Sequence, residues 1–355
     1  MGEHGDESFK RYIRACKARR QMEELLFQCE LCRKNKNFDE IIKVSDRILN
    51  NALQEALKLE PVPRDYGKMI DALVFITQKM PGSRYKNTAF SEAYCLLGKI
   101  FETGIVLPEN IKKAHEYYTI AAEHSNPFGC YRLAHFYEHG IACGKNLQKA
   151  AHFYKLSANG GCCRGMHRYG MMLLEGSVCK RDVKGGVFYL EQARKLATPN
   201  YPHVLYDLGV CYEKVPLMAG HILEDQEYAL AIFQEGDKLG CPRSSVRLGH
   251  AYNYGNLGLS KDTEKSIHYY TRAESVSGEA RFELYRIYLA QNNQEASLEW
   301  LKKSAMLGHP HGLKIYADAL EKGIGVPENK KEALWWFIIA KSKGMQVDME
   351  IKRCK

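Results

Sequence analysis

Large and small side chains recur with helical spacing along most of the chain, and the spacing itself repeats. A glycine ends such a stretch at Gly104, Gly140 and Gly176, 36 residues apart, and again with wider spacing at Gly255 and Gly323. Val215 and Gln291 take the place of this marker in two degenerate copies. Large residues stand seven and three positions before each of these marker glycines, which places them on one face of a helix. A small residue six positions before the marker lets a second helix approach closely, and the marker takes the left-handed cap without strain. These small residues are Gly98, Ala134, Gly170, Gly209, Gly249 and Ala317.

A second amphipathic helix is predicted after each marker. Small residues recur seven positions apart with two bulky residues between them, as in Ala114, Tyr117, Tyr118 and Ala121. Such a stripe suits a helix packed between its own partner and the next copy. The first small positions of these helices are Ala114, Ala150, Gly186, Ala229, Ser266, Ser297 and Ala333.

The unit is therefore a helix, a turn, a second helix and a second turn. It is about 36–40 residues long and occurs about seven times from residue 91 to residue 345, and residues 65–90 are a candidate degenerate copy. Residues 102–121 and 321–340 have nearly the same sequence, because the helices of each copy must pack in the same way. One helix pair cannot bury its apolar faces alone. We therefore predict an all-α fold, a right-handed α-solenoid superhelix of antiparallel helix pairs.

Two flanking segments do not follow the unit. Residues 1–64 are helical in pattern up to Pro61 and Pro63, and we expect an N-terminal helical segment that packs onto or caps the first copy. Residues 346–355 are expected to form a short polar tail. The predicted domains are therefore 1–64, the solenoid at 65–345, and the tail at 346–355.

Composition narrows the class of protein. The 355 residues are 45% hydrophobic and 26% charged, which is ordinary for a soluble globular chain. No apolar run approaches the ~18 residues of a transmembrane helix. The N-terminus has no apolar core of a signal peptide, so we expect a cytoplasmic protein with reduced cysteines.

The net charge of +9 is spread along the chain, with one local exception at residues 10–20. This stretch is either a solvated helix face or a surface for an anionic membrane or an acidic partner. Nucleic acid is not an expected partner, because the aromatic residues elsewhere sit at core spacing. The basic residues are Lys10, Arg11, Arg14, Lys17, Arg19 and Arg20.

No catalytic, metal or cofactor site is predicted, and no small-molecule substrate. Cys29 and Cys32 form one CxxC without a second pair, and His135 and His139 lie one helical turn apart without the acid of an HExxH motif. No phosphate-binding loop or nucleophile motif occurs. A glutamate recurs before the marker in four copies, which favours a structural task such as bonding the backbone of the next turn. These glutamates are Glu102, Glu138, Glu213 and Glu321.

Two aromatic residues depart from the pattern. Trp335 and Phe188 occupy a helix position that holds a polar residue in most other copies. A bulky aromatic at such a place is a candidate anchor for a protein partner. For Trp335 the alternative is packing against the C-terminal tail. The insert at 215–226 is a further candidate docking loop.

The repeated skeleton of Gly, Ala, paired Tyr and paired Ala resembles the Sel1-like repeat, a relative of the tetratricopeptide repeat. Three stretches are similar to the fungal chitin synthase regulatory factors: residues 197–213, 261–275 and 321–337. The most telling is the irregular opening of the fourth copy, Thr198-Pro-x-x-Pro-His-x-Leu-Tyr206.

The resemblance implies a non-enzymatic scaffold that binds a chitin synthase, activates it and helps to place it at the plasma membrane. The chain departs from some members of that family, because Cys354 is followed only by Lys355 and Asp6 does not fit a myristoylation motif. We therefore expect any peripheral membrane association to come through the partner or the basic stretch. The alternative function is an adaptor of another complex, such as one for membrane protein quality control.

Overall fold

The computed structural model describes residues 23–57, 66–79, 88–213 and 225–355. In these residues helices alternate with turns, and no strand forms beyond one isolated bridge between Thr198 and Tyr201. The all-α prediction is confirmed. Among the described helices, none combines the length and apolar character needed to span a bilayer.

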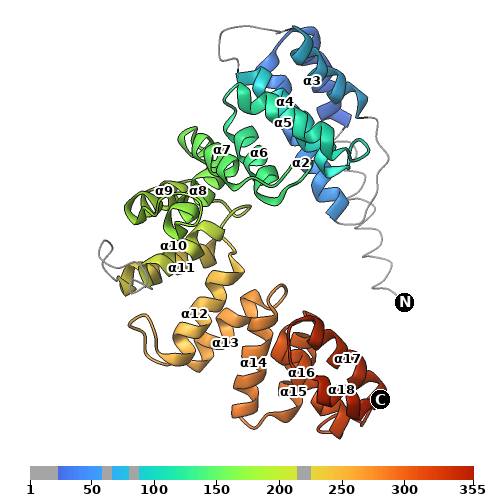
Figure 1. The fold of residues 1–355 in the computed structure, drawn as a ribbon, viewed down its shortest axis with the longest axis vertical. Helices are drawn as coiled ribbons and strands as arrows, with labels where there is room; N and C mark the ends of the chain where they lie inside the picture. Colours follow the sequence, from blue (N-terminus) through green and yellow to red (C-terminus); the bar gives the residue numbers. More distant parts are fainter. Residues whose placement is uncertain (1–22, 58–65, 80–87, 214–224) are drawn as a thin grey trace. The chain divides into compact units, whose positions relative to one another are not determined.

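The chain divides into two compact units, Met1–Ala193 and Arg194–Lys355. Within each unit, consecutive helices pack against each other in the order of the chain (Figure 1). Unit 1 holds a helix over residues 23–34. Its other helices are α2 (Phe38–Leu57), α3 (Gly67–Lys79), α4 (Thr88–Thr103), α5 (Ile111–Glu123), α6 (Pro127–His139), α7 (Leu147–Asn159), α8 (Cys163–Glu175) and α9 (Val183–Lys195).

Unit 2 continues the same alternation. Its helices are α10 (His203–Glu213), α11 (Gln226–Lys238), α12 (Pro242–Tyr254), α13 (Thr263–Ala273), α14 (Gly278–Ala290), α15 (Gln294–Met306), α16 (Pro310–Lys322), α17 (Lys330–Ser342) and α18 (Asp348–Cys354). The pairs that correspond to the repeated unit run from α4 and α5 to α16 and α17. The predicted boundaries at residues 64 and 345 remain predictions.

The marker glycines end the first helix of a pair as predicted. Gly104, Gly140, Gly176, Gly255 and Gly323 all have φ between 66° and 73°, in the left-handed region. At the other end, a short polar side chain starts most second helices. For example, the Asn146 carboxamide accepts a hydrogen bond from the Lys149 N–H at 2.9 Å. The turn chemistry therefore fixes where each helix of the pair begins and ends.

The small positions are places of close helix approach. A Cβ added to Gly98 would lie 2.8 Å from the Tyr118 ring, and one added to Gly249 would lie 2.6 Å from the Tyr270 ring. Ala114, the first small residue of its own helix, is fully buried. The predicted close approach of a second helix at the small residues is confirmed, and the group that approaches is an aromatic ring.

The recurring glutamates form side-chain bridges between helix pairs. Glu138 on α6 accepts a 2.6 Å hydrogen bond from the Tyr154 hydroxyl on α7 and pairs with Arg168 on α8. Burial disfavours the charge of Glu138, but the bonds from Tyr154 and Arg168 outweigh it and lower the pKa of the carboxyl. We call this ion pair, between a glutamate and an arginine on the helix that follows its pair, a rung.

The rung recurs in both units. Glu102 pairs with Arg132 and accepts a 2.7 Å bond from Tyr118, and Glu213 pairs with Arg247. The glutamates therefore have the structural task that was predicted. Their partners, however, are an arginine of the next pair and, for Glu102 and Glu138, a tyrosine of their own pair, and not the backbone of the next turn.

The two ends of the repeat array are covered by other helices. Leu25, Ile41 and Met69, from the 23–34 helix, α2 and α3, lie in one apolar core with Leu97 of α4. At the other end, the expected polar tail contains α18, and Val347 just before it is fully buried. Arg353 on α18 completes a rung with Glu321, at 3.0 Å between Nε and Oε1.

Candidate partner-binding groove

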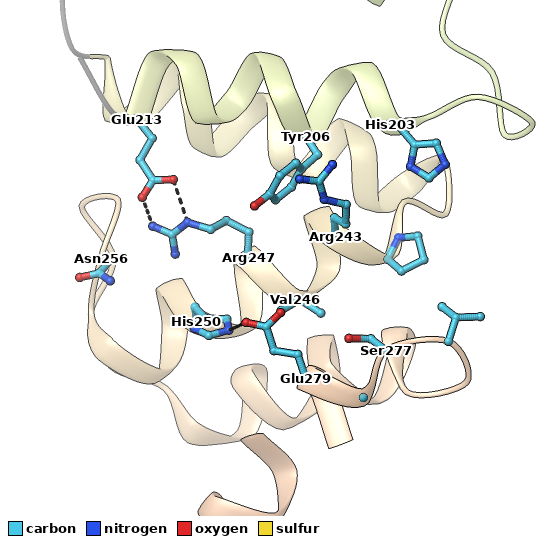
Figure 2. A pocket seen from close by; sticks show the side chains of 13 residues that line it. His203, Tyr206, Glu213, Arg243, Val246, Arg247, His250, Asn256, Ser277 and Glu279 are labelled. Atoms are coloured by element: carbon cyan, nitrogen blue, oxygen red, sulfur yellow. Dashed lines mark hydrogen bonds and ion pairs between the residues drawn. The ribbon is translucent and has the colours of Figure 1, made fainter. Parts of the chain in front are cut away.

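A cavity of about 700 Å³ lies on unit 2, lined by residues of α10, α12 and the first turn of α14. We call it the unit 2 groove. Figure 2 shows that charged and aromatic side chains from these helices face a common space. The lining residues are His203, Tyr206, Glu213, Pro242, Arg243, Val246, Arg247, His250, Asn256, Val276, Ser277, Gly278 and Glu279.

Helical spacing places the central wall of the groove. Arg243, Val246, Arg247 and His250 are three, four and seven positions apart, so α12 presents them on one face. Gly249, next to His250, lies under the Tyr270 ring, and Val246 is buried in the same apolar core as that ring. Of the four side chains, Arg243 is the one that is more than half exposed.

One ion pair in the groove is a rung. The Nε atom of Arg247 donates to Oε2 of Glu213 at 2.8 Å, and a second bond joins the same two side chains (Figure 2). Only 16% and 15% of the two side chains are exposed. Such a shielded, doubly bonded pair joins α12 to α10 and has little capacity left for a ligand.

Arg243 is held differently. Its guanidinium lies 3.8 Å from the centre of the Tyr206 ring, and Nη1 makes one 3.3 Å hydrogen bond to Oδ1 of Asp207. More than half of the side chain, 55%, is exposed. Stacking on the ring fixes the direction of the guanidinium while most of its N–H donors stay accessible.

The third charged pair stands on the far wall. Nε2 of His250 lies 3.3 Å from Oε1 of Glu279 (Figure 2), and the interaction with His250 is the main cause that lowers the pKa of Glu279. The Ser277 hydroxyl beside it accepts a hydrogen bond from the Ala280 N–H at 3.1 Å, which starts α14. The acid of this wall is therefore already partnered by a histidine.

The aromatic residues singled out from the sequence lie outside the groove. Trp335 on α17 is 55% exposed, and its ring meets the Trp336 ring edge-on at 4.6 Å between centroids. Phe188 on α9 is 57% exposed and meets Tyr189 in the same way. Both side chains are open to solvent in their own unit, and their role in partner binding stays a prediction.

Two other predicted features lie outside the described residues. These are the basic stretch from Lys10 to Arg20 and nearly all of the insert at 215–226. Of the insert, Asp225 and Gln226 are described, and the Asp225 carboxylate accepts a hydrogen bond from the Tyr228 N–H at 2.8 Å to start α11.

The pairs His135 and His139, and Cys29 and Cys32, were considered as metal ligands from the sequence, and their contacts are with other groups of the protein. The His139 Nδ1 atom bonds to the His135 carbonyl oxygen at 3.0 Å, and burial together with the Arg132 charge lowers the pKa of His135 to about 4. Cys29 is buried, which raises the pKa of its thiol, and its Sγ lies 3.7 Å from the Ser45 hydroxyl. Within the described ranges, no three His, Cys, Asp or Glu side chains gather as a metal site requires.

Sequence reasoning missed the groove and the arginines of the rungs. A signal for the rungs was present, because Arg132, Arg168 and Arg247 each stand eight positions before a marker glycine. No comparable signal exists for Arg243, whose surroundings come from two helices and the loop before a third.

The chain matches a known repeat profile. The Sel1 repeat matches six stretches that together make up more than half of the sequence. They are residues 91–126, 127–162, 163–197, 242–275, 282–309 and 313–345. The pair of α10 and α11 falls in the gap between the third and fourth matches and nevertheless folds as a helix pair.

The similar curated proteins are fungal regulators. The chain is 27% identical over 322 residues to chitin synthase regulatory factor 3 of Schizosaccharomyces pombe, which covers 86% of this chain and 34% of that protein. It is 32% identical over 166 residues to chitin synthase regulator SKT5 of Malassezia restricta, covering 44% of this chain and 11% of that protein. The chain thus spans at most about a third of the length of these two relatives.

Solved structures of two bacterial proteins share the fold. A Sel1 repeat protein from Oxalobacter formigenes superposes with a TM-score of 0.63 at 19% identity and covers 94% of both chains. A protective antigen of uropathogenic Escherichia coli with an SLR fold gives a TM-score of 0.62 at 20% identity, covering 91% of this chain and 69% of that one. These likenesses confirm the predicted class of helical-repeat solenoid.

Proposed function

Because the chain belongs to the Sel1 repeat family, we propose that it is a regulatory adaptor that binds a chitin synthase and activates or places it. The observation that carries the proposal is the similarity to chitin synthase regulatory factor 3, which extends over 86% of this chain. A stack of helix pairs offers a long surface of side chains that is already ordered before binding, so little conformational entropy is lost on docking.

The proposal assigns contact roles to the exposed aromatic residues. Trp335 and Phe188 would act as anchors, because each places a large apolar surface where the other copies carry mostly polar side chains. The basic residues between Lys10 and Arg20 would meet an acidic partner or the membrane that carries it. The adaptor would then work at the cytoplasmic face of the plasma membrane, held there through the synthase.

Affinity purification of the full chain from its own cells, followed by mass spectrometry, tests the partner. Recovery of a chitin synthase at near-stoichiometric amounts is the expected result. Recovery of factors of endoplasmic-reticulum protein degradation, without a synthase, would replace the proposal by the quality-control adaptor.

The anchor role is tested by Trp335→Ala and Phe188→Ala in the same purification. We expect each variant to recover several-fold less synthase, with an unchanged far-ultraviolet circular dichroism spectrum. Glu299→Ala is the matched control, because Glu299 occupies the place of Trp335 in the preceding copy and is also exposed. Equal recovery by all three variants would remove the aromatic residues from the interface.

A further inference from the structure

We propose that the unit 2 groove binds an extended peptide segment whose acidic side chain pairs with Arg243. This inference rests on the proposed adaptor function only in assuming a protein partner. Its chemistry comes from the groove itself, in which one cation has accessible donors and the other charged groups are already paired.

The pairing of charges singles out Arg243. Glu213 neutralises Arg247 through two hydrogen bonds, and His250 partners Glu279. Among the described residues, Arg243 uses one of its five N–H donors, at the long distance of 3.3 Å to Asp207. A carboxylate is the group that a planar guanidinium recognises best, through two parallel hydrogen bonds.

Tyr206 prepares this guanidinium for binding. The guanidinium lies over the ring at 3.8 Å from its centre, so the long side chain is ordered before a ligand arrives. An arginine that is already ordered loses less rotamer freedom on binding than a free one. The arrangement is therefore a preformed receptor for an anionic group and not a mobile surface charge.

The shape of the groove favours an extended chain. It runs from α10 across α12 to the start of α14, and helix axes come no closer than roughly 8–10 Å, so a groove across three helices is at least roughly 16–20 Å long. An extended peptide rises about 3.3 Å per residue, so five or six residues fit. Val276, an exposed apolar residue on the far wall, and Pro242 beside Arg243 offer contacts for apolar side chains that alternate with the acidic one.

Selection from a random ten-residue peptide library, displayed on phage, tests the inference with the full chain as bait. We expect enriched peptides to share one Asp or Glu flanked by apolar residues. Their synthetic forms should bind the variant Arg243→Gln at least about tenfold more weakly, the loss that a charge-assisted hydrogen bond predicts. Binding to Lys302→Gln, an exposed cation outside the groove, should be unchanged.

A charge exchange separates recognition from folding. In a second selection against Arg243→Glu, we expect Lys or Arg to replace the acidic residue at the shared position, which a merely misfolded variant would not produce. The inference is overturned by enriched peptides without a shared acid, by equal binding to Arg243→Gln, or by the absence of any enriched peptide.

The same variants distinguish this inference from the proposed function. If Arg243→Gln still recovers a chitin synthase while Trp335→Ala does not, the adaptor function stands and the groove is not its docking site. If the groove selects acidic peptides but no synthase is recovered, the groove stands and the identity of the partner is wrong.

Discussion

Tyr154 in unit 1 and Tyr270 in unit 2 occupy equivalent places in their helix pairs, and both are fully buried. The Tyr154 hydroxyl donates a 2.6 Å hydrogen bond to Glu138, whereas the Tyr270 hydroxyl is buried without a hydrogen-bond partner. The reason lies two positions before the marker glycine, where unit 1 has Glu138 and the copy that ends at Gly255 has Asn253.

The comparison separates two parts of the repeat. Both rings fill the same space under a small residue, so burial and shape are shared by the two copies. The polar part, the rung, is present in one copy and absent in the other. Packing therefore defines the repeat, and the rung adds stability only where all of its partners occur.

Glu138→Ala should give the largest effect, a loss of about 2–4 kcal/mol in the free energy of unfolding. The substitution leaves the buried Tyr154 hydroxyl without an acceptor and the Arg168 charge without its partner. Urea unfolding followed by circular dichroism measures it. The control is Glu299→Ala, which removes only an exposed pair with Lys303 and should cost less than about 0.5 kcal/mol.

Gly98→Val in unit 1 and Gly249→Val in unit 2 should each lower the free energy of unfolding by about 2 kcal/mol. The added atoms would collide with the Tyr118 ring at Gly98 and with the Tyr270 ring at Gly249. The same urea experiment applies. A large cost at one glycine and none at the other would mean that close packing is not the shared part of the repeat.

Removing the tyrosine hydroxyl should change the free energy of unfolding differently in the two copies. Tyr154→Phe is expected to lose about 1 kcal/mol, because Glu138 loses a buried donor. Tyr270→Phe is expected to be neutral or stabilising, since its hydroxyl has no partner to lose. Equal losses in the two variants would contradict the comparison.

The smallest effect concerns the start of α16 and depends on pH. Nδ1 of His309 accepts a hydrogen bond from the Gly312 N–H at 3.2 Å, a task that Asn126 performs for α6 in unit 1. Burial, with a contribution from His311, lowers the pKa of His309 below its ordinary value of 6.5 in the folded chain. Its contribution to stability is therefore present above pH 6.5 and is lost as the pH falls below that value.

His309→Asn should flatten this slope by up to about 1 kcal/mol between pH 7 and pH 5, because asparagine caps without titrating. Thermal unfolding across that range measures the slope. Asn126→Ala serves as the comparison, since it should lower stability by a similar amount at every pH in the range.

The fold could be predicted because the chain contains several copies of one unit, and comparing the copies shows which positions are constant. Small residues at fixed offsets, such as Gly98 and Ala114, identified the buried face of each helix, and the marker glycines identified the ends. The recurrence of Glu138 and its counterparts also indicated a structural task. Its arginine partner lies 30 residues away in the next copy, where matching within one unit does not find it.

The groove could not be predicted for a different reason. The orientation of Arg243 is set by the Tyr206 ring and by Asp207, which lie on α10, the first helix of the preceding pair. In sequence these residues lie about 36 positions away, whereas the equivalent small residues Gly209 and Gly249 lie 40 apart, so the contact does not follow the repeat. A stacked guanidinium with accessible donors is a property of three-dimensional contact, and periodicity does not report it.

The last rung has a consequence for self-association. The other rungs take their arginine from a following copy, whereas Glu321 receives its arginine from α18, a helix of seven residues that is too short to be a copy. With Val347 buried beside it, α18 covers the outer face of the last helix pair, as α2 and α3 cover that of the first. An uncovered end of such an array would offer another molecule a place to stack, head to tail, and α18 fills that place at this end with a short helix that makes the contact of a next copy.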